Sequence, residues 1–508
     1  METNNLEAND LEQPIYKQKK KKVAKKYPFS KLFGIGVLFV ITIIAFILIN
    51  FFNQTNNNFI ANEKNEKGEN NKISENCQPG YKSSDGKCEI NYSFKATYKT
   101  YKDNEKIPLI NSIELGIIKE MTVENNKVKP SKEYTFPKKG QYTIYFLLDD
   151  SKLDSLSQMF DGIINLESIS FTEIFNSEKI TKMNHMFRNC YSLIEVDFSK
   201  FNTKNVREMQ FMFYDCKALV SLDLSNLNNE NLVNMNRMFF NCKSLQSINL
   251  KNFTTPKVED MSYLFTNCDK IRTIDLSSFD TRNVRTMRGM FERCKSLFYA
   301  NIKFFNTEKV EDMSYMFNKC FSLVSVDSSE FFAPNVKSLA SMFYKCQALT
   351  SLDLSKLNGE KVIELDSMLE GCSSLSYINF SNFNPKNLDS MNYLFYFSTA
   401  LTSIDLTNFK TDSVKSMTGM FQGCNHLKKI KVSSFNTENV ESMVDMFNGC
   451  SSLQKIDISN FNMDKVKHLQ RIFDNCPSLS KGEILVNQKS FNKLERQIDE
   501  SLSLGVIN

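Results

Sequence analysis

This sequence of 508 residues has no tryptophan and only three histidines. The three are His185, His426 and His468. They lie far apart in the sequence and at unrelated positions of the 26-residue repeat that makes up most of the chain, so they supply no clustered acid–base or metal site. A glycine-rich phosphate loop, an H-E-x-x-H motif and a G-x-S-x-G motif are absent too. Because no candidate pair of titrating groups remains, we expect no enzyme activity, no cofactor and no metal site.

A strong net charge is also absent from most of the chain. The formal charge of +5 is concentrated in residues 1–31, which hold eight lysines and four acidic residues. The remainder is almost neutral and lacks the basic surface that a nucleic-acid-binding protein needs. We therefore expect no nucleic acid among the partners.

A long uncharged segment follows these lysines. Residues 32–52 read LFGIGVLFVITIIAFILINFF, and about 20 apolar residues are enough to cross a bilayer as a helix. A cleaved signal peptide, the alternative, has a shorter apolar core and a small-residue cleavage site. Because the lysines precede the segment, residues 1–31 are predicted to be a cytoplasmic basic tail. Residues 32–52 would then be a transmembrane helix acting as a signal anchor, and the protein a single-pass type II surface protein of the plasma membrane.

Three regions are expected between the membrane and the repeats. Residues 53–76, rich in asparagine, glutamate and lysine, are typical of a solvated polar stalk. The segment CQPGYKSSDGKC, Cys77 to Cys88, is predicted to form a disulfide loop outside the cell. In residues 90–150 apolar and polar positions alternate between turn residues, which predicts a small β-domain that covers the N-terminal end of the repeats.

The strongest feature is a cysteine that returns every 26 residues. It occupies positions 190, 216, 242, 268, 294, 320, 346, 372, 424, 450 and 476, and Ser398 fills the one gap. Twelve units cover residues 175–486 without an insertion, and residues 151–174 are a degenerate first repeat. A period of this length predicts a stacked array whose units fold together.

The apolar spacing within one unit predicts its cross-section. In FNTENVESMVDMFNGCSSLQKIDISN, residues 435–460, the first apolar side chains follow the i, i+3, i+6, i+7 spacing of a short helix: Val440, Met443, Met446 and Phe447. Three later ones match a leucine-rich strand motif: Leu453, Ile456 and Ile458. The predicted fold class is an α/β repeat solenoid, leucine-rich-repeat-like, with 26-residue units of a short helix plus a short parallel strand.

The cysteine column has three possible roles. A buried free thiol is an ordinary small core residue. Disulfides between adjacent rungs would make alternate rungs unlike one another, and Ser398 interrupts the column without disturbing the period. A metal site would need a second type of ligand, and none repeats beside the cysteines. Core packing with free thiols is the favoured interpretation.

The repeats FNTENVESMVDMFNGCSSLQKIDISN, FDTRNVRTMRGMFERCKSL and FNTEKVEDMSYMFNKCFSLVSVDSS resemble those of BspA-type leucine-rich repeat surface proteins of bacteria and protists. The resemblance covers residues 175–486 and implies a solenoid at the cell surface, with adhesion or recognition as its role. The common consensus has asparagine or cysteine after the last strand leucine. Here phenylalanine stands there, as at Phe409, Phe435 and Phe461, so we expect a phenylalanine spine in place of an asparagine ladder.

The C-terminal end of the array also needs a cover. In SFNKLERQIDESLSL the apolar residues share one helical face, which predicts a capping helix within residues 487–508: Phe491, Leu494, Ile498 and Leu502.

One column of polar residues is the candidate binding site. The strand residue between two inward apolar ones must point outward, and in most units it is aspartate or asparagine. It is either a solvated face with local side-chain hydrogen bonds, or a contact surface for a protein, a glycan or cations. The predicted binding residues are Asp223, Asp275, Asp327, Asp353 and Asp405.

These observations predict a membrane-anchored surface protein that presents one solenoid face to a protein or glycan partner. The alternative is a structural coat protein whose solenoids associate with one another. If the repeats are extracellular, three sequons become predicted glycosylation sites: Asn91, Asn252 and Asn379.

Overall fold

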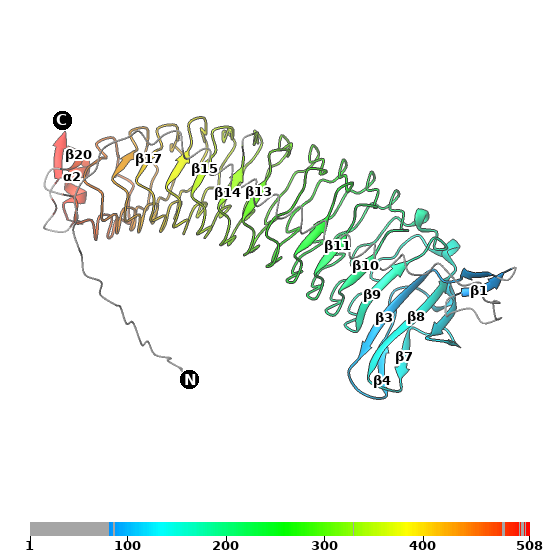
Figure 1. Cartoon of the computed structure of the whole chain (residues 1–508). Coiled ribbons are helices and arrows are strands. Elements are labelled where there is room, and N and C mark those ends of the chain that lie inside the picture. Colours follow the sequence, from blue (N-terminus) through cyan, green and yellow to red (C-terminus); the bar gives the residue numbers. More distant parts are fainter. Residues whose placement is uncertain are drawn as a thin grey trace, which may run out of the picture. The chain divides into compact units, whose positions relative to one another are not determined.

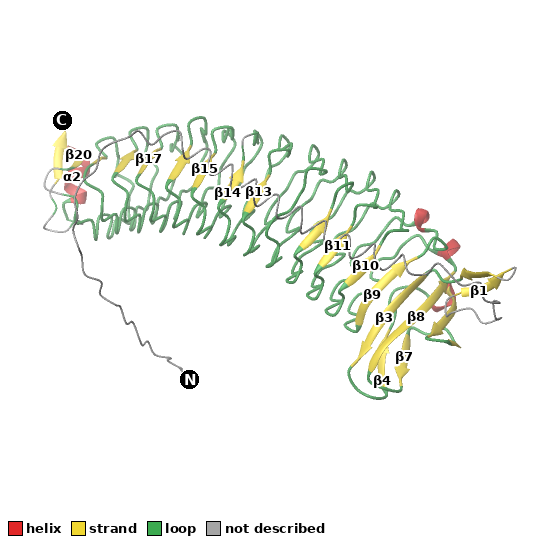
Figure 2. Cartoon of the chain, viewed as in Figure 1, coloured by secondary structure: helices red, strands yellow, loops and turns green. Residues whose placement is uncertain are grey.

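The computed structural model describes residues 81–84, 87–328, 330–479, 483–496, 498, 502 and 504–507 (Figures 1 and 2). The predicted basic tail, transmembrane segment 32–52, polar stalk and Cys77 lie outside these residues. Among the residues described, no helix is long and apolar enough to cross a membrane.

The N-terminal region is built from strands, as its alternating pattern predicts. The strands are β1 (Tyr81–Ser84), β2 (Lys87–Ile90), β3 (Phe94–Thr100), β4 (Glu105–Pro108), β5 (Ile118–Val123), β6 (Asn126–Val128), β7 (Glu133–Phe136) and β8 (Gly140–Leu148). Single 3-10 turns occupy Leu115–Ile117, Asp150–Lys152 and Ser177–Lys179. Alternate residues of β3 are buried, with Phe94, Ala96 and Tyr98 inside.

The sheet of this region continues into the first rungs of the solenoid. Its strand order is β10-β9-β3-β8-β5-β6, where β9 is Leu166–Phe171 and β10 is Glu195–Asp197. Strand β3 pairs antiparallel with both β8 and β9, and β9 pairs parallel with β10. The N-terminal strands therefore cover the backbone edge of the first rung, which would otherwise expose unpaired N–H and C=O groups.

The remaining strands come from the following repeats, except the one at residues 273–275, which forms no strand, and lie side by side along one face (Figure 1). They are β11 (Ser221–Asp223), β12 (Ser247–Asn249), β13 (Tyr299–Asn301), β14 (Ser325–Asp327), β15 (Ser351–Asp353), β16 (Tyr377–Asn379), β17 (Ser403–Asp405), β18 (Lys429–Lys431) and β19 (Ile456–Asp457). These strands pair in parallel with a shift of one 26-residue repeat, for example Leu222 opposite Ile248. The structure is thus the predicted solenoid of about twelve 26-residue turns.

The short helix predicted in each unit is wrong, and Figure 2 shows loops in its place. Alternate backbone N–H groups donate across to carbonyl oxygens of the next rung at 2.8–3.0 Å, in the pairs Met443–His468, Asp445–Gln470, Phe447–Ile472 and Gly449–Asp474. Asp445 and Gly449 have positive φ, 56° and 76°, which a right-handed helix excludes. The i, i+3 spacing arises from tight turns, such as the one closed by the Cys450 N–H on the Phe447 carbonyl at 3.1 Å.

A phenylalanine column at the Met-Phe position of the repeat forms the centre of the core. Ring centroids of consecutive members are 5.2–5.8 Å apart, with planes within 13°, through Phe187, Phe213, Phe239, Phe265, Phe291, Phe317 and Phe343. The spine predicted at the other column is buried but less regular, since Phe383 and Phe409 are tilted by 57°. Asparagine also forms a ladder, at another position: the side chains of Asn205, Asn231, Asn283, Asn335 and Asn439 donate to backbone carbonyls of the preceding rung.

All eleven repeat cysteines are free and buried, in agreement with the packing interpretation. Burial raises the pKa of Cys372 and of Cys424 to about 12, so these thiols are protonated at neutral pH.

The C-terminal cover differs from the predicted helix over residues 487–508. Helix α2 covers only Gln488–Leu494, with the Asn487 side chain accepting from the Ser490 N–H at its start. The chain then returns as β21 (Leu504–Ile507), which pairs parallel with β20 (Ile484–Asn487). Leu494 and Leu502 are buried as the apolar pattern predicts, but only the first of them is in the helix.

Candidate functional site

The outward residues of β10–β19 form a surface that we call the strand face. In β11, Leu222 is buried and its neighbours Ser221 and Asp223 are exposed. The same alternation in β15 and β17 exposes Asp353 and Asp405. Asp327 in β14 is half-buried, and Asp275 is exposed at the same position of a rung that forms no strand. The predicted aspartates thus occupy equivalent positions in five rungs, and Asp275 is counted with the strand face.

These aspartates hold the turn that follows each strand. A carboxylate oxygen of Asp223 accepts hydrogen bonds from the Ser225 N–H (2.9 Å) and from its hydroxyl (2.7 Å). Backbone N–H groups donate in the same way to Asp275 (2.9 Å), Asp353 (2.8 Å) and Asp405 (3.1 Å). Such side-chain to backbone bonds are typical of aspartate and asparagine in turns.

The turn needs an oxygen, but it does not need a negative charge. Asn249, Asn301 and Asn379 accept the same bond in their own rungs, at 3.2, 3.2 and 3.0 Å. A neutral amide thus performs the structural task. The turns therefore do not require the negative charges of Asp223, Asp275 and Asp353.

The charge on the strand face is balanced near its C-terminal end. Lys431 forms an ion pair with Asp405 at 2.8 Å, and this hydrogen bond is the main cause of the lowered pKa of Asp405. In the ranges that the structure covers, Asp223, Asp275 and Asp353 have no lysine or arginine within ion-pair distance. Burial raises the pKa of Asp353, but hydrogen bonds from Ser355 and Asn379 outweigh burial and leave that pKa lowered.

Two exposed tyrosines on the strand face were missed by sequence reasoning. Tyr299 is 37% exposed and Tyr377 is 60% exposed, at a position where serine is the commonest residue among the rungs. They lie three rungs apart, opposite Ser325 and Ser351 in their strand pairs. Burial, followed by the neighbouring Asp327, raises the pKa of Tyr299. The signal in the sequence was an aromatic residue at a position that is polar in the other rungs. Aromatic residues are enriched at binding surfaces.

The other predicted sites are placed only in part. Asn252 is exposed, but its side-chain amide donates to the Ser225 carbonyl at 3.0 Å. Asn91 and Asn379 are half-buried, and glycosylation of all three stays a prediction. Strands β1 and β2 pair with Ser83 opposite Cys88, while Cys77, the predicted disulfide partner, lies outside the described residues.

These features define the class of the protein as a leucine-rich-repeat-like solenoid. The sequence matches the family described as "Mycoplasma protein of unknown function, DUF285" over residues 147–248, 234–350, 324–429 and 391–503. The matched segments cover more than half of the chain, and the protein belongs to this family. Among curated proteins, none matches the sequence.

Solved structures of bacterial leucine-rich repeat proteins are similar to this chain at low identity. A leucine-rich repeat protein from Bacteroides ovatus has 16% identity and a TM-score of 0.36, over 79% of this chain and 91% of that one. A leucine rich cell surface protein from Faecalibacterium prausnitzii has 17% identity and a TM-score of 0.30, over 68% and 78%. A leucine-rich repeat protein from Eubacterium ventriosum has 14% identity and a TM-score of 0.29, over 62% and 91%.

Proposed function

We propose that this protein is anchored in the membrane, displays its solenoid at the cell surface, and binds a protein or glycan partner without catalysing a reaction. The strand face between Asp223 and Tyr377 is the contact surface. The observation that carries the proposal is the charge of Asp223, Asp275 and Asp353, which the turns do not require, since asparagine holds the same turn in neighbouring rungs. A row of carboxylates at the strand spacing of about 4.8 Å costs stability through repulsion, and a basic or polyhydroxylated partner would relieve it.

The exposed tyrosines support the same location. Tyrosine combines a large apolar area with a hydroxyl group and few rotatable bonds, and it is enriched at binding hot spots. Tyr299 and Tyr377 bracket the rungs of Asp327 and Asp353. Aromatic side chains and carboxylates thus occur together on the central rungs of the strand face.

The test removes charge from the strand face and keeps its hydrogen bonds. Asp275, Asp327 and Asp353 are changed together to asparagine in the full-length chain. Because asparagine retains the turn, thermal unfolding should be unchanged or slightly improved. Capture of a partner from a cell-surface extract should weaken about tenfold and lose its salt dependence.

The matched control removes three exposed carboxylates from another side of the rungs: Glu230, Glu308 and Glu438, each changed to glutamine. This variant should capture the partner as the wild type does. Equal capture by both triple variants would contradict the proposed contact surface. Concentration-dependent self-assembly of the wild-type chain in sedimentation, with no captured partner, would favour the coat protein instead.

A further inference from the structure

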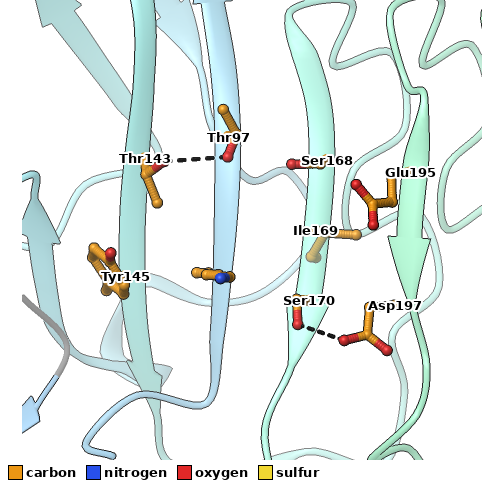
Figure 3. Close-up of a pocket in the computed structure, with 9 residues that line it drawn as sticks. Thr97, Thr143, Tyr145, Ser168, Ile169, Ser170, Glu195 and Asp197 are labelled. Atoms are coloured by element: carbon orange, nitrogen blue, oxygen red, sulfur yellow. Dashed lines mark hydrogen bonds between the residues drawn. The ribbon is translucent and has the colours of Figure 1, made fainter. Parts of the chain in front are cut away.

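A polar groove of about 310 Å³ lies on the sheet where the N-terminal strands meet the first rungs (Figure 3). Two rows of side chains cross strands β8, β3, β9 and β10. One row is Thr143, Thr97, Ser168 and Glu195, and the other is Tyr145, Lys95, Ser170 and Asp197. The groove is thus built from hydroxyl groups, two carboxylates and one ammonium group.

The backbone N–H and C=O groups of the strands under this groove already form hydrogen bonds within the sheet. Strand β3 is paired along its length with β8 and over most of it with β9, and β9 is paired with β10. A bound peptide therefore cannot be recognised here by strand addition, which requires a free sheet edge. Recognition must come from the side chains that stand on the sheet.

Two of the charged side chains are available to a ligand. Lys95 and Glu195 are exposed, and neither has a partner of opposite charge within ion-pair distance in the part of the chain that the structure describes. Asp197 is half-buried and held in place: its carboxylate accepts from the Ser170 hydroxyl at 2.9 Å (Figure 3) and from the Ser199 N–H at 2.8 Å. Burial raises the pKa of Asp197, but these hydrogen bonds outweigh burial and lower it, so the group is ionised at neutral pH.

The lining excludes several kinds of ligand. Ile169 is the one aliphatic side chain of the groove, and it is 2% exposed, so an apolar ligand finds little to contact. A single ammonium group beside two carboxylates disfavours phosphate, sulfate and nucleic acid. Groups that both donate and accept hydrogen bonds suit the mixture of hydroxyls and carboxylates.

We propose that this groove is a binding site for a neutral or amine-bearing saccharide. Sugar hydroxyls donate to the carboxylates of Glu195 and Asp197 and accept from the Lys95 ammonium group. The hydroxyl groups of Thr97 and Ser168 supply further hydrogen-bond donors and acceptors to the same ligand. The site lies at the N-terminal end of the strand face, and it goes beyond the proposed contact at Asp223 to Tyr377, because it uses other strands and other residues.

The experiment is a glycan array that carries neutral, amine-bearing and anionic saccharides, probed with the full-length chain. The saccharide that binds most strongly is then titrated into the full-length chain by calorimetry. Neutral or amine-bearing saccharides should be bound. Binding to none of the saccharides, or to the anionic ones alone, would overturn the proposal.

Variants locate the site. Glu195→Gln and Asp197→Asn should each weaken saccharide binding about tenfold, because each removes a charged acceptor. In the Asp197→Asn variant the amide oxygen of the new side chain can still accept the Ser199 N–H. The fold is therefore expected to hold, which thermal unfolding checks.

The matched control is Asp457→Asn. Asp457 has the same turn contact with Ser459, at 3.0 Å, at the opposite end of the strand face. It should leave saccharide binding unchanged. If Asp457→Asn loses binding as much as Glu195→Gln, the groove is not the site. Loss of saccharide binding in the triple variant of Asp275, Asp327 and Asp353, with binding retained in Glu195→Gln, would instead place the saccharide on the strand face.

Discussion

Each repeat cysteine acts in the core as a small hydrogen-bond donor. The Cys294 thiol donates to the Phe265 carbonyl at 3.1 Å, and the other repeat cysteines make the equivalent bond. Ser398, which replaces cysteine in one rung, donates its hydroxyl to the Leu369 carbonyl at 2.8 Å. The position therefore selects a small side chain with a donor, which explains why serine is tolerated there.

This contact predicts that Cys294→Ser is mild and Cys294→Ala is worse. Serine keeps the donor, so we expect a loss of less than about 1 kcal/mol in the free energy of unfolding. Alanine removes one of the two donors to the Phe265 carbonyl, which also accepts the Cys268 N–H at 3.1 Å, and it leaves the volume of the sulfur atom empty. It should cost about 1–3 kcal/mol. Urea unfolding of the full-length chain measures both.

The neighbouring core column supplies the comparison. Phe291 is stacked between Phe265 and Phe317, with centroids 5.7 and 5.4 Å away, so Phe291→Ala should cost about 3–5 kcal/mol. If Cys294→Ser destabilises the chain as much as Phe291→Ala, the cysteine is not an interchangeable donor.

At the residue scale, sequence predicted which strand side chains point outward, because alternation is a property of any strand. It left open whether the aspartates only hold turns, because that depends on where the next backbone N–H lies. The tyrosines at 299 and 377 were not singled out, since two aromatic residues in a column that also holds serine, threonine, lysine and glutamate are a weak signal.

At the element scale, the turns between strands are what sequence could not distinguish. Buried residues three apart are expected both from a helix and from a series of i→i+3 turns. The two structures differ in the carbonyl groups that accept hydrogen bonds from alternate N–H groups. In the solenoid these carbonyls belong to the next rung, which is present only when the rungs are stacked. The positive φ values give little warning in the sequence, because Tyr263 and Tyr315 occupy positions where glycine or asparagine is usual.

Gly289 is a glycine at the position where the neighbouring rungs have Tyr263 and Tyr315, and it tests this description of the turn. Its φ is +59°, and an added Cβ would lie 2.5 Å from the ring of Tyr263 in the preceding rung. Since Tyr315 adopts the same φ in the next rung, the ring and not the backbone should exclude a side chain. Gly289→Ala should therefore cost about 1–3 kcal/mol in urea unfolding, as overpacking does.

Two controls separate the causes. Gly162→Ala adds a side chain at φ +72° with nothing within 4 Å, and Gly116→Ala adds one in open space, so each should cost less than Gly289→Ala. Combining Gly289→Ala with Tyr263→Ala should remove the penalty specific to Gly289. Persistence of the full penalty in the double variant would show that the turn is strained for another reason.

At the scale of the whole molecule, the period determined most of the fold. A strict 26-residue repeat fixes the number of rungs and forces equivalent residues to stack, so core columns and the strand face follow from it. The ends were harder to predict, because each occurs once. The N-terminal strands join the solenoid sheet through β3 and β9, whereas the C-terminal cover combines the short α2 with a returning strand.

The central claim is that the strand face, and not the turns, is the recognition surface. Hydroxyl-radical footprinting of the full-length chain, alone and with its captured partner, tests it most directly. Tyr299 and Tyr377 on the strand face should lose reactivity on binding. Tyr393, 38% exposed and at a positive-φ position in a turn, should react equally in both states. Protection of Tyr393 with unchanged Tyr299 and Tyr377 would contradict the account.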